Sequence, residues 1–276
     1  MTIVAIDINE ANANCYADTK ISPANNSGGS LTNLSGKILA FSYVSLCSIK
    51  KPRRKVTSRS SEALFCYAGS TLVANSVFAI GANFCRNMYK NDKPTRASLL
   101  DVAEVFQYVF DQVMVEVNAK RLIGDSLDCE FAIIGFCSVE KRSRAFHIRS
   151  VFSDKSWSSE RFEIANPGWL LLGDKSGFYM HFRRHKAAAA AVQRLPNILD
   201  VLRDVIQDSG VPSVGGHLQW AECSKKGIEF GPVMSRTDDP KTLTRQFCGV
   251  NLDFFKPTNR GFLIGDYGEG TRHKGV

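Results

Sequence analysis

The sequence lacks the signals that direct a chain into or across a membrane. No run of eighteen apolar residues occurs in it, so a membrane-spanning helix is not expected. Its N-terminus has no basic segment that leads into an apolar stretch, which argues against a signal peptide. We therefore predict a cytoplasmic protein with no membrane partner.

Signals for a metal site or a disulfide framework are missing as well. The eight cysteines are scattered, mostly within apolar or strand-like sequence, and no CxxC pair occurs among them. Buried free thiols in a reducing compartment are the expectation for such cysteines. His181 and His185 lie four residues apart, but Phe182 stands where an HExxH zinc motif requires glutamate. The sequence therefore predicts no metal and no cofactor.

The positive charge of the chain does not by itself predict a nucleic-acid partner. The formal net charge is +8 and the pI is about 9.1, and binding to phosphates needs such charge. The basic run Lys50-Lys51-Pro52-Arg53-Arg54-Lys55 is short, however, and no aromatic residues interleave with it. We interpret the run as the solvated edge of an inserted segment that faces a partner subunit.

Apolar periodicity predicts both strands and helices. The 276 residues are 44% hydrophobic, which is enough for one large domain with a sizeable core. Strands are predicted at residues 2–8, 13–20, 38–47, 128–137, 143–152, 160–173 and 217–221. Helices are predicted after Ser70, after Ser98, where Asp101 completes a capping box, and from Pro196 to Asp208.

The first residues contain a nucleophile that could carry its own base. Removal of Met1, which the small side chain of Thr2 permits, would leave a threonine with a hydroxyl and a free α-amine. Such an amine has an ordinary pKa near ~8, so a sizeable fraction is neutral at physiological pH and can accept the hydroxyl proton. Thr2 is therefore the predicted catalytic nucleophile.

Two intervals along the chain accompany Thr2. The step Asp18-Thr19-Lys20 begins sixteen residues after Thr2, and Lys55 precedes the turn Gly69-Ser70 by fourteen. With these two spacings, the chain resembles the proteasome β-subunit and bacterial proteasome-like threonine peptidase family of the N-terminal nucleophile (Ntn) hydrolases. The resemblance covers about residues 2–225.

The resemblance implies an α+β fold in the form of a four-layer α/β/β/α sandwich. It implies a proteasome-like Ntn-hydrolase domain at residues 1–232, with an insertion at about 22–50, and a C-terminal extension at 233–276. The insertion follows from the long interval between Asp18 and Lys55. Because of that interval, Lys37, Lys50 and Lys51 compete with Lys55 for the same role.

The resemblance also implies roles for the site residues. Lys55 would stabilise the negative charge that develops on the Thr2 hydroxyl, and Asp18 would orient and neutralise this lysine. Backbone N–H groups around Gly69 would supply an oxyanion hole. An extended peptide substrate would be bound by Lys20, Cys66, Ala68, Gly69 and Ser70.

The later motifs match the family less closely. The turn Gly173-Asp174-Lys175-Ser176-Gly177 implies Ser176 as a catalytic hydroxyl near Thr2, with Asp174 as its rival. The family carries an aspartate four residues before the first glycine of the Gly215-Gly216 step, and Val211 stands at that position here. Asp208 lies three residues too early to replace it without a rearrangement of the loop.

The implied function is that of a threonine-type endopeptidase. It would hydrolyse peptides or unfolded proteins inside a homo-oligomeric ring, with an ATP-dependent unfoldase as an implied partner. Two alternatives stay open. One is a non-catalytic proteasome-like assembly or binding subunit that keeps Met1, and the other is an Ntn amidase acting on a small substrate. The mature N-terminus tests the first alternative, and the size of the amide that is cleaved tests the second.

Overall fold

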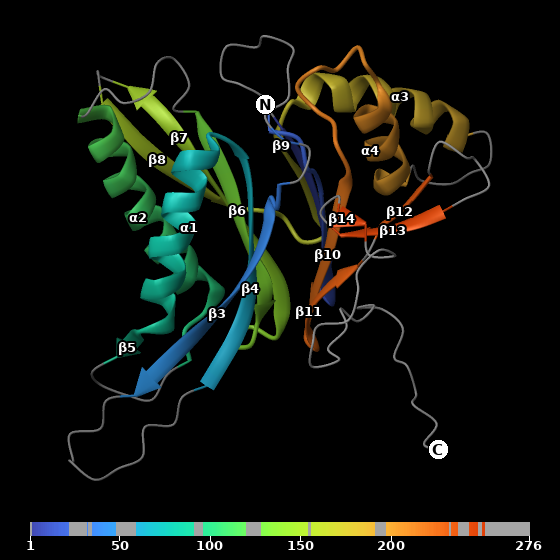
Figure 1. Cartoon of the computed structure of the whole chain (residues 1–276). Coiled ribbons are helices and arrows are strands. Elements are labelled where there is room, and N and C mark those ends of the chain that lie inside the picture. Colours follow the sequence, from blue (N-terminus) through green and yellow to red (C-terminus); the bar gives the residue numbers. More distant parts are fainter. Residues whose placement is uncertain are drawn as a thin grey trace, which may run out of the picture.

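The computed structural model consists mainly of two β-sheets that face each other (Figure 1). It describes residues 2–21, 32, 35–47, 59–90, 96–119, 128–153, 156–190, 197–231, 233–236, 243–247 and 250–251. Helices α1 (Thr71–Arg86) and α2 (Leu99–Ala119) lie outside the larger sheet, and α3 (Lys175–Ala190) and α4 (Ile198–Gln207) lie outside the smaller one.

The smaller sheet contains the N-terminal hairpin. Its antiparallel strands follow the order β11 (Gly227–Gly231), β10 (Leu218–Ser224), β2 (Asn12–Asp18), β1 (Ile3–Ile8) and β9 (Gly168–Gly173). Asn9 forms the hairpin turn, where its side-chain oxygen accepts hydrogen bonds from the N–H groups of Ala11 and Asn12. Val4 lies opposite Ala17, so the hairpin register brings Thr2 to the end of β2 at Asp18.

The larger sheet is built from the middle of the chain. Its strands follow the order β5 (Met88–Lys90), β3 (Ile38–Cys47), β4 (Arg59–Gly69), β6 (Cys129–Cys137), β7 (Arg142–Ser153) and β8 (Ser156–Glu163). The pair β3–β5 is parallel and the other pairs are antiparallel. Residues 38–47, which the sequence analysis placed within an insertion, therefore form a strand of this sheet.

A third, three-stranded sheet lies in the segment that the sequence analysis treats as a C-terminal extension. It consists of β12 (Val233–Arg236), β13 (Leu243–Phe247) and β14 (Val250–Asn251), which pair antiparallel. Residues 252–276 of the predicted extension lie outside the described residues.

The helices on the larger sheet begin where the sequence predicts. The Ser70 hydroxyl caps α1 by accepting the N–H of Val73. At α2, the Asp101 carboxylate accepts the N–H of Ser98 and the Ser98 hydroxyl accepts the N–H of Asp101, which confirms the capping box. In the described part of the chain, no helix is both long and apolar enough to cross a membrane.

Aliphatic and small side chains fill the space between the two sheets. Val4 and Ile6 of β1 pack there with Leu64 and Ile134 of the larger sheet, and all four are fully buried. Truncating such a residue to alanine costs about 2–5 kcal/mol, because the cavity that remains is only partly closed. This packing fixes the two sheets relative to each other and so fixes the ends of their strands near Thr2.

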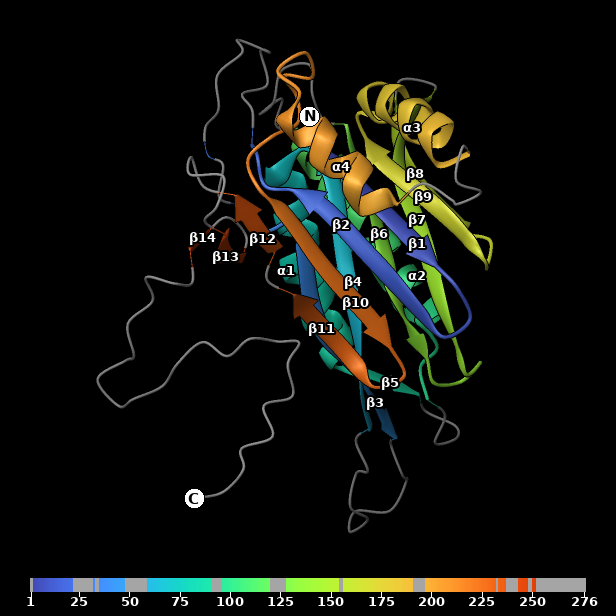
Figure 2. The ribbon, with the colours of Figure 1, turned by 90° about the vertical axis from the view of Figure 1, so that its right-hand side faces the viewer.

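The predicted four-layer α/β/β/α sandwich is wrong as a description of this fold. The described chain is mostly antiparallel sheet, and α3 and α4 cover one end of the smaller sheet only (Figure 2). That end presents the apolar residues Ile3, Leu171 and Leu218 to the helices. Toward the other end, the same face of the sheet carries the polar residues Asn14 and Glu222. A helix packs on a sheet by burying apolar side chains, so this polar part of the face does not favour a covering helix.

The predicted single strand at residues 160–173 is also wrong. It consists of two strands in different sheets, because β8 ends at Glu163 after pairing with β7, and β9 begins at Gly168 and pairs with β1. The chain therefore crosses from the larger to the smaller sheet at residues 164–167. This crossing brings Gly173, at the end of β9, next to Thr2.

Candidate active site

Thr2, Asp18 and Lys37 form a buried polar cluster at one end of the smaller sheet. The hydroxyl of Thr2 donates a hydrogen bond to Asp18 Oδ1 over 2.5 Å, and Lys37 Nζ lies 2.8 Å from the same oxygen. The side chain of Asp18 is 0% exposed and that of Lys37 is 3% exposed. The structure therefore brings two of the predicted site residues, Thr2 and Asp18, into direct contact, although the sequence analysis assigned Asp18 to a lysine partner.

The Asp18 carboxylate accepts hydrogen bonds from several parts of the chain. Besides the two side chains, the backbone N–H of Ile3 donates to Oδ1 over 3.0 Å, and the N–H of Gly215 donates to Oδ2 over 3.2 Å. Buried charges are tolerated when they are paired and hydrogen-bonded in this way. The cluster therefore holds the N-terminal strand, Lys37 and the 210–216 loop in one fixed arrangement.

Lys37 is the lysine that contacts Asp18. The sequence analysis favoured Lys55, which lies outside the described residues, and kept Lys37 as a competitor. Lys37 also donates a hydrogen bond to the backbone oxygen of Lys20. Burial lowers the pKa of Lys37 below its ordinary value, an effect that Asp18 opposes. The site thus contains an ammonium group whose charge is weakly solvated and directed at the Thr2–Asp18 pair.

Asp174, directly after β9, forms a second polar cluster beside Thr2. Its backbone N–H donates to the carbonyl oxygen of Thr2 over 2.9 Å. Its carboxylate accepts the hydroxyl of Ser176 on Oδ1 over 2.7 Å and the hydroxyl of Ser213 on Oδ2. Ser176, the predicted catalytic hydroxyl, is thus bonded to its rival Asp174, and no hydrogen bond from Ser176 to Thr2 is present among the described contacts.

The other late positions do not supply a carboxylate to Thr2. Val211 lies in the apolar cluster between α3, α4 and the smaller sheet. Asp208 accepts the N–H of Gly210 and pairs with His181 Nε2 at 2.8 Å. Asp208 therefore ties the end of α4 to α3.

The end of β4 lies close to Thr2. A Cβ added at Gly173 would meet the Thr2 carbonyl oxygen at 1.8 Å and the Ala68 side chain at 3.2 Å, so these three residues are in close contact. Gly69 has a φ of 97°, a left-handed conformation that glycine adopts without strain. The predicted oxyanion-hole segment and Thr2, the predicted nucleophile, are thus neighbours.

The remaining predicted substrate-binding residues have partners of their own. The side chains of Cys66 and Ala68 are buried between the sheets, and Ser70 caps α1. The N–H of Lys20 donates to Gly215 O over 3.2 Å, and its Nζ donates to Pro212 O over 2.7 Å. The backbone of Ser70 is engaged as well, because its N–H donates to Asp128 O over 3.0 Å.

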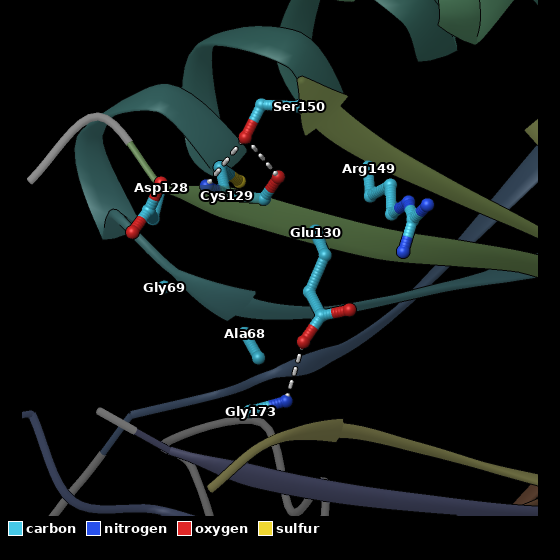
Figure 3. Close-up of a pocket in the computed structure, with 8 residues that line it drawn as sticks. All are labelled: Ala68, Gly69, Asp128, Cys129, Glu130, Arg149, Ser150 and Gly173. Carbon is cyan, nitrogen blue, oxygen red and sulfur yellow. Dashed lines mark hydrogen bonds between the residues drawn. The ribbon is translucent and has the colours of Figure 1, made fainter. Parts of the chain in front are cut away.

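A cavity of about 270 Å³ adjoins this region (Figure 3). It lies between the strand ends at Ala68–Gly69, Asp128–Glu130, Arg149–Ser150 and Gly173. Glu130 points across the gap between the sheets, where Oε1 accepts the N–H of Gly173 over 2.6 Å and Oε2 meets His147 Nε2 at 2.8 Å. Burial would raise the pKa of Glu130, but these hydrogen bonds lower it overall.

The sequence analysis missed two contributors to the site. Glu130 lies within an otherwise apolar strand, and its only signal was the charge itself. Ser213 lies thirty-nine residues from Asp174, and no spacing rule connects them. Within the described residues, no group of three or more histidine, cysteine, aspartate or glutamate side chains is placed to hold a metal.

Comparisons with known proteins find similar folds but no sequence family. No family model matches the chain, and no curated protein matches it. Among solved structures, Anbu (ancestral β-subunit) from Yersinia bercovieri is 14% identical, with 83% of this chain and 87% of that chain covered and a TM-score of 0.53. The Anbu complex from Pseudomonas aeruginosa, described as a helical assembly, is 14% identical over 87% of this chain and 88% of that chain, with a TM-score of 0.55.

A mutant Anbu (Gly-1) from Hyphomicrobium sp. strain MC1 is 11% identical over 89% of this chain and 87% of that chain, with a TM-score of 0.55. The likeness is one of fold. The assignment to the proteasome β-subunit and bacterial proteasome-like threonine peptidase family is wrong, because no family model supports it and the structural neighbours are Anbu proteins. The two spacings that suggested it describe the positions of residues, and they do not establish membership of that family.

Proposed function

We propose that this chain hydrolyses amide bonds with Thr2 as an N-terminal nucleophile, after removal of Met1. The observation that carries the proposal is the buried cluster in which Thr2 Oγ1 and Lys37 Nζ share one oxygen of Asp18. A structural threonine at a strand end has no need of a buried ion pair, whereas a nucleophilic hydroxyl benefits from a cation close to its developing charge.

The reaction would proceed through an ester of Thr2. The hydroxyl proton passes to the Thr2 α-amine while Oγ1 bonds to the carbonyl carbon and the carbonyl electron pair moves to oxygen. Backbone N–H groups at Gly69 would stabilise that oxyanion. Collapse breaks the C–N bond, the leaving amine takes the proton from the ammonium, and water then releases the acyl group by the same steps in reverse.

Peptides are the substrate class that we propose. The end of β4 lies beside Thr2, and a strand end can pair with an extended peptide backbone. The cavity lined by Glu130, Arg149 and Gly173 is large enough for one side chain of such a peptide. A small amide substrate would not need this combination, although it would react by the same chemistry.

We further propose homo-oligomeric assembly. The Anbu complex from Pseudomonas aeruginosa is described as a helical assembly, and the present chain is similar to it in fold. A shallow site beside strand ends gains selectivity when an assembly restricts access to it. Sedimentation at micromolar concentration tests this part, and a stable monomer would contradict it.

The experiment for the catalytic proposal begins with the intact mass of the purified protein, which shows whether Met1 is removed. A protein that starts at Thr2 should cleave fluorogenic peptides, Thr2→Ser should keep measurable turnover, and Thr2→Ala should reduce it at least ~1000-fold. Ser76→Ala is the matched control, because within the described contacts its hydroxyl donates to Leu72 O on the exposed side of α1. Retention of activity in Thr2→Ala, or in protein that still carries Met1, would refute the mechanism.

A further inference from the structure

Two segments that must meet in the proposed reaction belong to different sheets. Thr2 precedes β1 of the smaller sheet, whereas Ala68–Gly69 ends β4 of the larger sheet. The sheets contact each other mainly through aliphatic and small side chains, and apolar burial is non-directional. Catalytic groups must be held within about 0.5 Å of their productive geometry. Directional bonds that cross between the sheets near Thr2 are therefore candidates for this task.

On the β2 side of Thr2, such bonds are part of the site already described. Lys37, directly before β3, reaches Asp18 at the end of β2 over 2.8 Å. The side-chain oxygen of Gln219 in β10 accepts the N–H of Lys37 over 2.9 Å and the N–H of Ile38 over 3.2 Å. These bonds tie β2 and β10 of the smaller sheet to β3 of the larger one. They do not hold β9, which lies on the other side of β1.

Glu130 makes the corresponding link on the β9 side. It lies in β6 opposite Ala68 of β4, and its side chain points toward the smaller sheet, where Oε1 accepts the N–H of Gly173 over 2.6 Å (Figure 3). Among the described strands, β9 is at the edge of the smaller sheet, so on this side it has no neighbouring strand to bind its N–H groups. Glu130 supplies the acceptor that a further strand would otherwise provide.

The Glu130 carboxylate is itself fixed in place. Its second oxygen, Oε2, meets Nε2 of His147 on the adjacent strand β7 at 2.8 Å, and the side chains of Glu130 and His147 are 21% and 10% exposed. The hydrogen bonds to the carboxylate lower the pKa of Glu130, so the group is ionised at neutral pH. Hydrogen bonds to an ionised acceptor are shorter and stronger than those between neutral groups. The bond to Gly173 is therefore a firm connection between the two sheets.

This connection reaches Thr2 through the end of β9. The N–H of Asp174, the residue after Gly173, donates to the carbonyl oxygen of Thr2 over 2.9 Å. A Cβ added at Gly173 would meet that oxygen at 1.8 Å and the Ala68 side chain at 3.2 Å. Gly173 thus lies between the two segments that the reaction requires, and Glu130 sets its position.

We propose that Glu130 is a positioning residue that, through Gly173, holds Thr2 in register with the end of β4. The inference rests on the proposed role of Thr2 as an N-terminal nucleophile. Glu130 acts as a hydrogen-bond acceptor and takes part in no proton transfer. Loss of the acceptor would let the end of β9 and Thr2 shift, and a misplacement of about 1 Å costs about 100-fold in rate. The loss should appear in kcat, because peptide binding to the end of β4 does not require Thr2 to be in place.

The test compares two substitutions of similar length. Glu130→Gln keeps a side-chain oxygen that can accept the N–H of Gly173, whereas Glu130→Met has none. The peptide substrates carry alanine on both sides of the scissile bond, so that no large side chain enters the cavity beside Glu130. We expect Glu130→Met to lower kcat about 10–100-fold with KM within about threefold of wild type, and Glu130→Gln to keep kcat within about threefold.

Glu104→Met is the matched control for loss of a carboxylate. Glu104 lies on α2 and pairs with Arg161 at 3.1 Å on the helix-covered side of the larger sheet, so we expect its kcat to stay within about twofold of wild type. All assays are run well below the Tm of each variant, so that the folded fraction is the same. Wild-type kcat in Glu130→Met would overturn the inference. Equal losses in Glu130→Gln and Glu130→Met would do so as well, because they would assign the effect to charge.

Hydrogen exchange of single amides gives a second readout that needs no peptidase activity. The N–H of Gly173 should exchange at least ~10-fold faster in Glu130→Met than in wild type or Glu130→Gln, while the amides within β1 keep their protection. Unchanged protection in β1 distinguishes release of the β9 end from a loss of global stability. Equal exchange at Gly173 in wild type and Glu130→Met would overturn the inference. If wild type cleaves no peptide, the proposed function fails, and the Gly173 amide still decides whether Glu130 holds β9.

Discussion

Replacement of Lys37 by methionine gives a direct test of the buried ion pair. The variant keeps an unbranched chain of similar length and removes the ammonium that lies 2.8 Å from Asp18 Oδ1. Removing one partner of a buried pair costs about 3–5 kcal/mol, because the other charge is left without compensation. Asp18 keeps hydrogen bonds from Thr2, Ile3 and Gly215, so we expect about 3 kcal/mol, at the low end of that range.

Urea and thermal denaturation measure this loss. For a chain of this size, about 3 kcal/mol corresponds to a fall in Tm of about 6–12 °C. Lys20→Met is the comparison, since Lys20 Nζ donates to Pro212 O in an exposed contact, and we expect it to cost less than about 1 kcal/mol. The double variant Asp18→Asn/Lys37→Met should recover part of the loss, because both charges are then gone.

The same variants distinguish between the two lysines that the sequence offered. Lys37→Met should reduce peptidase turnover at least ~100-fold, whereas Lys55→Ala should leave it nearly unchanged, because the cation belongs to Lys37. Equal stability of Lys37→Met and Lys20→Met would refute the reasoning about burial. Loss of activity in Lys55→Ala with full activity in Lys37→Met would restore the assignment made from the sequence.

Two further predictions concern Gly173 and Glu130. Gly173→Ala should destabilise the fold by about 2 kcal/mol or more and abolish turnover, because the new Cβ would lie 1.8 Å from Thr2 O and residue 173 has a φ of 83°. A thermal melt followed by circular dichroism measures the stability, and a peptide assay measures the turnover. A variant with wild-type stability and turnover would contradict the close contact. Glu130 has a folded-state pKa below its ordinary value, so it contributes stability that is fully present above about pH 4.5 and is lost as pH falls through the folded-state pKa. Urea denaturation from about pH 6 to 3 should therefore show a steeper fall for wild type than for Glu130→Gln, and parallel curves would count against the contacts to Gly173 and His147.

Local patterns predicted the elements that depend on neighbouring residues. The capping box at Ser98 and Asp101 and the N-cap at Ser70 are both present, because each needs only three or four consecutive residues. The N-terminal hairpin was equally accessible, since two short alternating strands joined by a polar turn predict antiparallel pairing. These are the parts of the fold for which sequence reasoning sufficed.

Contacts between distant segments could not be obtained in this way. The interval from Lys55 to Gly69 looked informative, but β3 and β4 form a long pair from Ile38↔Cys66 to Ser45↔Arg59, and the lysine at Asp18 lies just before β3. The spacing between two residues along the chain does not show at which residue the long β3–β4 hairpin begins, and this start position decides which lysine lies next to Asp18. Helices cover only one end of the smaller sheet, and this too depends on which strands become neighbours. For example, β2 pairs with β10, which is about two hundred residues away in the sequence.

The free-energy cost of burying the Asp18–Lys37 ion pair beside Thr2 argues that the pair does not serve stability alone. Two opposite charges that are almost fully buried are rarely a gain in stability over apolar side chains of similar volume, because the desolvation of both ions must be offset. A well-packed apolar core already fills the space between the two sheets, so the ion pair is not required to hold the sheets together. Under the proposed function, the pair supplies a fixed electrostatic field at the Thr2 hydroxyl before a substrate binds, and preorganised charges of this kind accelerate reactions. If Asp18→Asn/Lys37→Met proved more stable than wild type while turnover fell at least ~100-fold, the same substitution would separate stability from catalysis at this site.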